Sequence, residues 1–203
     1  MGGASNNKTE PGSRPLEAGQ GQAGVSPSVR ALRVVMTAVG VLVLAVSACN
    51  SSGGDAAAPP DGTEQFDVGT ANHVSGDVEY SQTPPVGGDH DPAWQNCGVY
   101  RQRVREENAV HSLEHGAVWI TYRPGLEDEA IQALEERARG ETHVLVTPFE
   151  GLDDRVVLSA WGRQLRVDSA DDERIDAFIS AFQQGPQSPE AGASCSGAIG
   201  DPR

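Results

Sequence analysis

Basic residues are scarce in this chain of 203 residues, which has 15 Lys plus Arg against 29 Asp plus Glu and a formal charge of -14. Nucleic acids are bound by clusters of Lys and Arg, because these side chains displace the counterions of the phosphates. The composition therefore argues against a nucleic-acid partner. The length suits one domain with tails and excludes a large multidomain enzyme.

A hydrophobic run long enough to span a membrane is also missing. The longest uncharged apolar run, Val34–Ala48, has about 15 residues, whereas a spanning helix needs about 20. Arg30 and Arg33 precede this run, which therefore fits the hydrophobic region of a signal peptide. It ends in Val46–Cys49, which resembles a bacterial lipobox. We predict cleavage before Cys49 and lipidation of its thiol, which would anchor the protein to the extracytoplasmic face of the cell membrane.

Two alternatives to the lipoprotein interpretation are an uncleaved signal anchor and a chance match. By composition, residues 1–48 combine a disordered N-terminus with the signal peptide, and residues 49–65 have the small, polar composition of a flexible tether. We expect one folded domain over residues 66–185 and a C-terminal tail over residues 186–203.

Cysteine is rare, with three residues in the chain. Thiols oxidise outside the cytoplasmic membrane, so Cys97 and Cys195, which remain besides Cys49, are predicted to form a disulfide. The bond would tie the tail to the middle of the domain. The alternative is that Cys97 ligates a metal and Cys195 is free.

Apolar periodicity predicts the secondary structure of the second half of the chain. Alternating side chains predict strands over 117–122, 143–149 and 155–161, with a short fourth strand over 164–167. Stripes at helical spacing predict one helix after Pro124-Gly125 and another that Ser169 caps. These elements predict an α+β fold with a small three- to four-stranded sheet and two helices on one face.

The other face of this sheet needs a cover. The preceding segment, Phe66–Ser112, has few strand or helix signals, and a loop of this length in a small domain is usually functional or disordered. Four of the five histidines lie in or beside it. We therefore expect a long, irregular, His-bearing segment that covers the second face and holds the site. Trp119 is the candidate for an exposed apolar patch if a partner protein covers that face instead.

Histidine is concentrated near the middle of the chain, where a carboxylate accompanies it. Neutral imidazoles and carboxylates are ligands of zinc and copper(II). Methionine occurs only before Cys49, at Met1 and Met36, so a thioether copper(I) site is excluded after cleavage. We predict a metal site for copper or zinc, with copper named first, whose candidate ligands are His73, His90, His111, His115 and Glu114. His143 is expected to be an ordinary strand residue.

Two other interpretations of the cluster remain open. It can be a structural hydrogen-bond network in a non-catalytic interaction or assembly module of the cell envelope. It can also belong to a small metal-dependent hydrolase, because residues 111–115 have the letters of an HxxEH motif. That motif needs its three residues on one helix, whereas Gly116 and a strand from Ala117 leave room for one helical turn at most. We therefore assign no catalytic residue and favour a protein that is not an enzyme.

Several blocks of this region are distinctive: His73-Val74 with Tyr80, Pro84-Pro85 to His90, Trp94, Gly98–Tyr100 and Val110–Gly116 running into Tyr122. Together they resemble the domain of unknown function 3105 family of bacterial envelope proteins. The resemblance covers about residues 65–190, and its HSLEHG block is fairly specific. Many members carry an N-terminal membrane helix, which the lipobox replaces here. Because the family has no established activity, the resemblance implies fold and location more than function.

Overall fold

The structure, a computed structural model that describes residues 57–203, is built around one mixed sheet of six strands. The predicted N-terminal region, the signal peptide and Cys49 lie outside the described residues, as do residues 50–56 of the predicted tether. Within residues 57–203, no helix has both the length and the apolar character that crossing a membrane requires.

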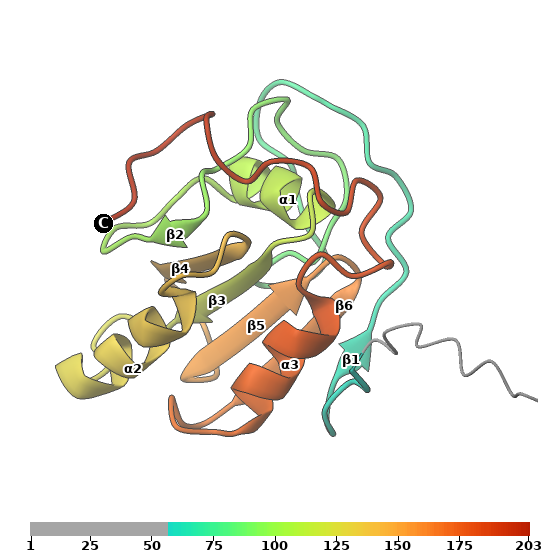
Figure 1. Ribbon diagram of the computed structural model, residues 1–203. Coiled ribbons are helices and arrows are strands. Elements are labelled where there is room, and N and C mark those ends of the chain that lie inside the picture. The colour runs from blue at the N-terminus through green and yellow to red at the C-terminus, as the bar shows by residue number, and fades with distance from the viewer. Residues whose placement is uncertain (1–56) are drawn as a thin grey trace, which may run out of the picture. The chain divides into compact units, whose positions relative to one another are not determined.

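The strands follow the order β1-β6-β5-β3-β4-β2 across the sheet (Figure 1). The sheet runs parallel between β3 and β4, which α2 (Asp128–Ala138) connects, and antiparallel between β3, β5 and β6. The prediction of an α+β fold is confirmed. The four longer strands of the sheet coincide with the four predicted strands: β3 (Val118–Tyr122), β4 (Val144–Pro148), β5 (Val156–Ala160) and β6 (Arg163–Val167).

Two-residue strands at both edges make the sheet larger than predicted. β1 (Glu64–Gln65) pairs with β6, and β2 (Gly98–Val99) pairs with β4. The prediction of three or four strands is therefore too small, because a two-residue strand leaves no periodic pattern in the sequence. β1 also places ordered chain before residue 66, the predicted start of the domain.

Helices α2 and α3 (Arg174–Phe182) cover one face of the sheet, as predicted (Figure 1). Alternate strand residues such as Ile120 point to this face and form a core with Leu134 and Phe178. The predicted cap of α3 is wrong, because that helix begins five residues after Ser169. The Ser169 hydroxyl instead accepts a hydrogen bond from the backbone N–H of Asp171.

The segment before β3 covers the opposite face, but it contains a helix that the sequence analysis did not expect, α1 (Glu106–Glu114) (Figure 1). Leu113 of α1 and Trp119 of β3 belong to the second core, and both are fully buried. The Trp119 indole N–H donates to Thr147 Oγ1 at 2.9 Å. Trp119 therefore offers no surface patch to a partner, and the assembly-module interpretation loses the support that this residue gave it.

Gly116 connects α1 to β3 in a conformation that other residues rarely adopt. Its φ is +101°, and a Cβ there would lie 2.8 Å from Gln184 Cα. Gly116→Ala is expected to lower the free energy of unfolding by more than about 1 kcal/mol, through backbone strain and this collision. The matched control is Gly125→Ala, since Gly125 has a φ of +89° but its Cβ would meet nothing within 4 Å. If urea denaturation shows the same loss of stability for both variants, the collision at Gly116 is contradicted.

Candidate metal centre

The last turn of α1 presents three of the candidate residues. His111 and Glu114 lie inside the helix, and His115 is its C-cap. The expectation of one helical turn at most is wrong, since α1 has 9 residues. Glu106 and Glu107 in its first turn favour the helix, because carboxylates interact well with the positive end of the helix dipole. Two of the three HxxEH residues therefore lie in one helix, and the third caps it.

His73 and His90 come from the irregular segment and reach α1 through backbone pairing. The two residues form an isolated parallel bridge, with Val74 N donating to His90 O at 2.8 Å and His90 N donating to Asn72 O at 3.0 Å. Asp89 accepts from Asn72 N at 2.9 Å. This local pairing holds the two histidines side by side without a regular element.

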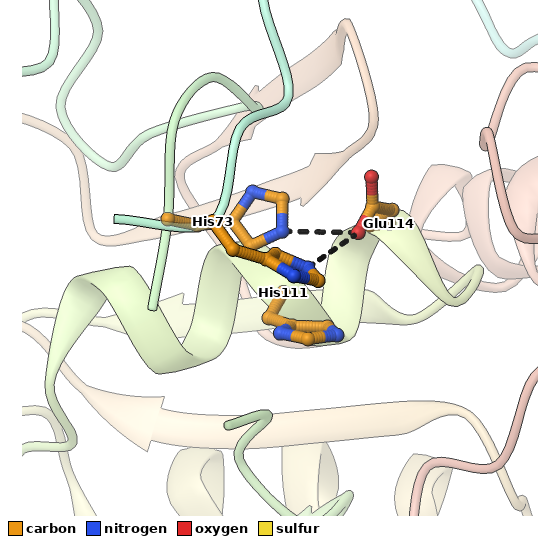
Figure 2. A group of neighbouring side chains, drawn as sticks. His73, His111 and Glu114 are labelled. Atoms are coloured by element: carbon orange, nitrogen blue, oxygen red, sulfur yellow. Dashed lines mark hydrogen bonds and ion pairs between the residues drawn. The ribbon is translucent and has the colours of Figure 1, made fainter. Parts of the chain in front are cut away.

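Four of the predicted ligands meet in one place. His73, His90, His111 and Glu114 each offer one donor atom, and these atoms all lie within 4.8 Å of one another. His90 Nε2 is 3.0 Å and His73 Nε2 is 3.7 Å from Glu114 Oε2. Two donors on one tetrahedral zinc lie roughly 3.3 Å apart. Figure 2 shows His73, His111 and Glu114 gathered around this point.

The cluster is buried except on one side. His90 is fully buried, and His111 and Glu114 are 3% and 5% exposed. The side chain of His73 is 49% exposed. Solvent therefore reaches the cluster past His73.

The proton positions on three imidazoles follow from their backbone partners. The Nδ1 atoms of His90, His111 and His115 lie 2.8, 2.7 and 2.7 Å from the carbonyl oxygens of Gly88, Asp91 and Ser194. A carbonyl oxygen can only accept, so each Nδ1 carries the hydrogen. In a neutral ring, Nε2 then carries no hydrogen and has a free lone pair that can accept a hydrogen bond or bind a metal.

These lone pairs point at other acceptors. His90 Nε2 faces the Glu114 carboxylate at 3.0 Å, and His111 Nε2 faces His115 Nε2 at 3.0 Å. Two acceptors at this distance repel unless a cation lies between them or one ring takes up a second proton. Metal-binding histidines typically have this arrangement, in which one ring nitrogen donates to a backbone carbonyl and the other is left for the ion.

Protonation of His111 is unfavourable. Burial is the main cause that lowers its pKa from 6.5 to about 4, and the neighbouring His115, His90 and His73 lower it further. The ring is therefore uncharged at neutral pH, which is the form that binds metals.

An ion pair on the surface of α1 fixes the carbonyl that orients His111. Arg105 Nη1 lies 2.7 Å from Asp91 Oδ2, and Arg105 Nε lies 3.0 Å from Glu107 Oε2. Asp91 accepts a hydrogen bond from the backbone N–H of Ala93 and faces the guanidinium of Arg105, and both contacts lower the pKa of its carboxyl group. The loop residue that receives the Nδ1 hydrogen of His111 is thus held to the start of the same helix.

His115 lies beside the four-residue group and is not one of its members. It contacts His111, and its Nε2 is 3.5 Å from Glu190 Oε2 in the C-terminal tail. Sequence reasoning missed Glu190, because nothing in the sequence distinguishes it from the other acidic residues. His143 is likewise outside the four-residue group. It was expected to be an ordinary strand residue, but it lies just before β4, where its Nε2 binds Ala193 O at 2.8 Å.

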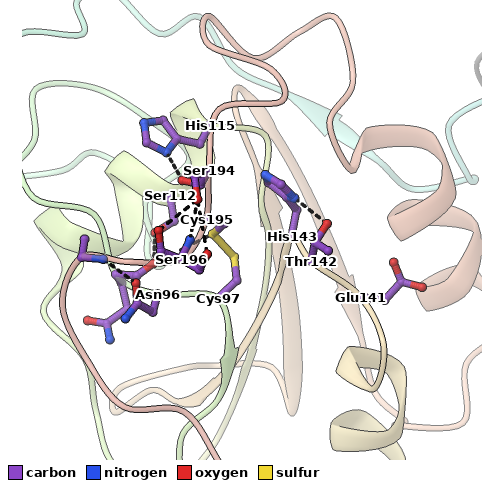
Figure 3. Close-up of a disulfide and its surroundings, with 12 residues drawn as sticks. Asn96, Cys97, Ser112, His115, Glu141, Thr142, His143, Ser194, Cys195 and Ser196 are labelled. Atoms are coloured by element: carbon purple, nitrogen blue, oxygen red, sulfur yellow. Dashed lines mark hydrogen bonds between the residues drawn. A yellow bond between two sulfur atoms is a disulfide. The ribbon is translucent and has the colours of Figure 1, made fainter.

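The predicted disulfide between Cys97 and Cys195 is present, over a sequence separation of 98 residues. It leaves no thiolate at Cys97, so the alternative of a cysteine ligand is wrong. In Figure 3 the disulfide lies in the region between the side chains of His115 and His143, and Ser194 is the residue next to Cys195. The bond therefore fixes the stretch of tail whose carbonyls contact both histidines.

Comparison with known proteins gives one match. A family model, described as a protein of unknown function (DUF3105), matches residues 73–197, which is more than half of the chain. The match contains the four clustered donors and both bonded cysteines, and it confirms the resemblance of the sequence blocks. No curated protein and no solved structure matches the chain.

Proposed function

Since the chain belongs to the DUF3105 family, whose function is unknown, we propose a function from its own residues. The protein binds a divalent metal ion on the extracytoplasmic face of the membrane, to which a lipid at Cys49 anchors it. The ligands are His73, His90, His111 and Glu114.

One observation carries the proposal, namely the lone pair of His90 that faces a carboxylate in a buried place. The His90 Nδ1 hydrogen is committed to Gly88 O, so in the neutral ring Nε2 meets Glu114 Oε2 as acceptor against acceptor at 3.0 Å. Burying such a pair without a cation is costly. A divalent ion converts the repulsion into two bonds.

The donor set decides which ions fit. Imidazole and carboxylate suit zinc and copper(II), and the order of affinities of divalent ions favours copper(II). Zinc can still occupy the site where copper is scarce. The chain also carries almost twice as many acidic as basic residues, which raises the local concentration of cations.

Metal analysis of the purified full chain tests the proposal. We expect bound copper or zinc and, after removal by a chelator, an increase in Tm when Zn²⁺ or Cu²⁺ is added. Free metal at 100 times its Kd stabilises a folded protein by about 2.7 kcal/mol. The structural-network interpretation predicts no bound metal and an unchanged Tm. That result would overturn the proposal.

Metal-dependent hydrolysis is a second candidate, because His111 and Glu114 lie in α1 and His115 caps it, close to what an HxxEH motif requires. The burial of all three side chains weighs against it, since a substrate must reach the ion. Turnover of a peptide or ester substrate by the zinc-loaded chain, absent from the metal-free chain, would favour this candidate.

The location has its own test in Cys49→Ala. Removal of the thiol that accepts the lipid should leave the precursor uncleaved, and Ser51→Ala should be processed normally as the matched control. Cell fractionation with mass spectrometry of the N-terminus measures both. A Cys49→Ala variant that still fractionates with membranes at the processed mass would contradict the lipid anchor.

A further inference from the structure

The contact between His111 and His115 is not needed by an ion at His90 and Glu114. The two Nε2 atoms lie 3.0 Å apart, and both Nδ1 hydrogens are donated to backbone carbonyls, those of Asp91 and Ser194. Two imidazole lone pairs therefore converge at the end of α1. The His111–His115 pair is therefore a second place where two hydrogen-bond acceptors face each other, beside the His90–Glu114 pair.

The carboxylate of Glu190 lies close to the His111–His115 pair. Its Oε2 is 3.5 Å from His115 Nε2, and its side chain is 56% exposed. Backbone hydrogen bonds hold this part of the tail on α1, because Glu190 N donates to Glu114 O at 3.0 Å and Gly192 N donates to His115 O at 3.1 Å. A cation from solvent can therefore reach the two imidazoles past Glu190.

We propose that a second divalent cation, zinc or copper(II), binds between His111, His115 and Glu190, next to the first. This inference rests on the proposed function, because it divides one cluster into two sites. With two ions bound, His111 is a ligand of the second ion instead of the first, and the first keeps His73, His90 and Glu114 from the four ligands proposed above. Each ion then has three protein ligands and an open position, whereas structural zinc sites have four protein ligands.

Bond lengths favour two ions over one. Ligands on opposite sides of a single ion, each about 2.0–2.2 Å from it, lie at most roughly 4.4 Å apart. His115 is outside the group of donors that lie within 4.8 Å of one another. One ion therefore does not bind all the convergent donors, whereas two neighbouring ions can, and known two-metal sites hold their ions about 3.5–4 Å apart.

Calorimetric titration of the metal-free full chain with Zn²⁺ tests the second site. We expect two equivalents for the unchanged chain and one for Glu190→Gln, with circular dichroism showing that the variant is folded. The control is Glu150→Gln, which removes an exposed carboxylate elsewhere in the fold and should keep two equivalents. His115→Ala should behave like Glu190→Gln.

The outcomes separate this inference from the proposed function. A single equivalent that Glu190→Gln and His115→Ala leave unchanged would overturn the second site and retain the first. Loss of all binding in a folded Glu190→Gln would also overturn it, since one shared site would explain that result. No binding by the unchanged chain would overturn both proposals.

Copper offers an independent measurement. Two Cu²⁺ ions at about 3.5–4 Å, the spacing of two-metal sites, couple magnetically. The fully loaded chain should then show a half-field electron paramagnetic resonance signal that Glu190→Gln loses. An uncoupled copper spectrum at full loading would overturn the pair.

Discussion

Replacing His90 by glutamine is expected to weaken metal binding at the first site by more than about 100-fold. His90 is fully buried, and its Nδ1 is fixed to Gly88 O, so its Nε2 is held in one position against Glu114. Residues that merely orient metal ligands already contribute about 10- to 100-fold to affinity. Loss of a preorganised ligand should therefore cost more.

His143→Gln is the matched control for this variant. His143 is also buried and hydrogen-bonded, yet it lies apart from the cluster. Competition titrations against a zinc chelator measure the first-site Kd of both variants, and Tm without metal reports on folding. A folded His90→Gln with the affinity of the unchanged chain would show that the ion does not bind at His90.

Removing the disulfide should produce the largest loss of stability. The double variant Cys97→Ser, Cys195→Ser frees a loop that spans a sequence separation of 98 residues, and the chain-entropy model gives about 4.7 kcal/mol for a loop of about 100 residues. Domains of this size are stable by about 5–15 kcal/mol. The variant is therefore expected to be close to unfolding, as measured by urea denaturation.

Reduction supplies the control for the double variant. Dithiothreitol should lower the stability of the unchanged chain to that of the variant and leave the variant itself unchanged. Release of the tail also removes the anchor beside Ser194, whose carbonyl orients His115, so Zn²⁺ at the second site should weaken. A double variant as stable as the unchanged chain would contradict the role of the bond.

The sheet and the helices α2 and α3 could be predicted because their burial follows the chain's periodicity. Val118, Ile120 and Tyr122 face one core while Trp119 faces the other, which is the alternation that identifies a strand. α1 could not be predicted in the same way. Its buried residues include five polar ones, so the helix has no clear apolar stripe: Glu107, Asn108, His111, Ser112 and Glu114.

The gathering of the four candidate residues was predictable from residue types, but the arrangement of their ring nitrogens was not. His73, His90, His111 and Glu114 were named from the sequence, and the structure brings their donor atoms together. The roles of the ring nitrogens depend on backbone carbonyls that no sequence pattern identifies. Glu190 joins the cluster only because the tail folds back on α1, and a contact between such distant residues leaves no local signal.

Anomalous diffraction from crystals of the zinc-loaded protein, measured at the zinc absorption edge, tests the central claim most directly. Binding at the cluster predicts an anomalous peak about 2.0–2.2 Å from His90 Nε2 and from the carboxylate of Glu114. A second peak bonded to His115 and Glu190 would accompany it if the centre holds two ions. Zinc-loaded crystals with no peak at His90 and Glu114 would contradict the account.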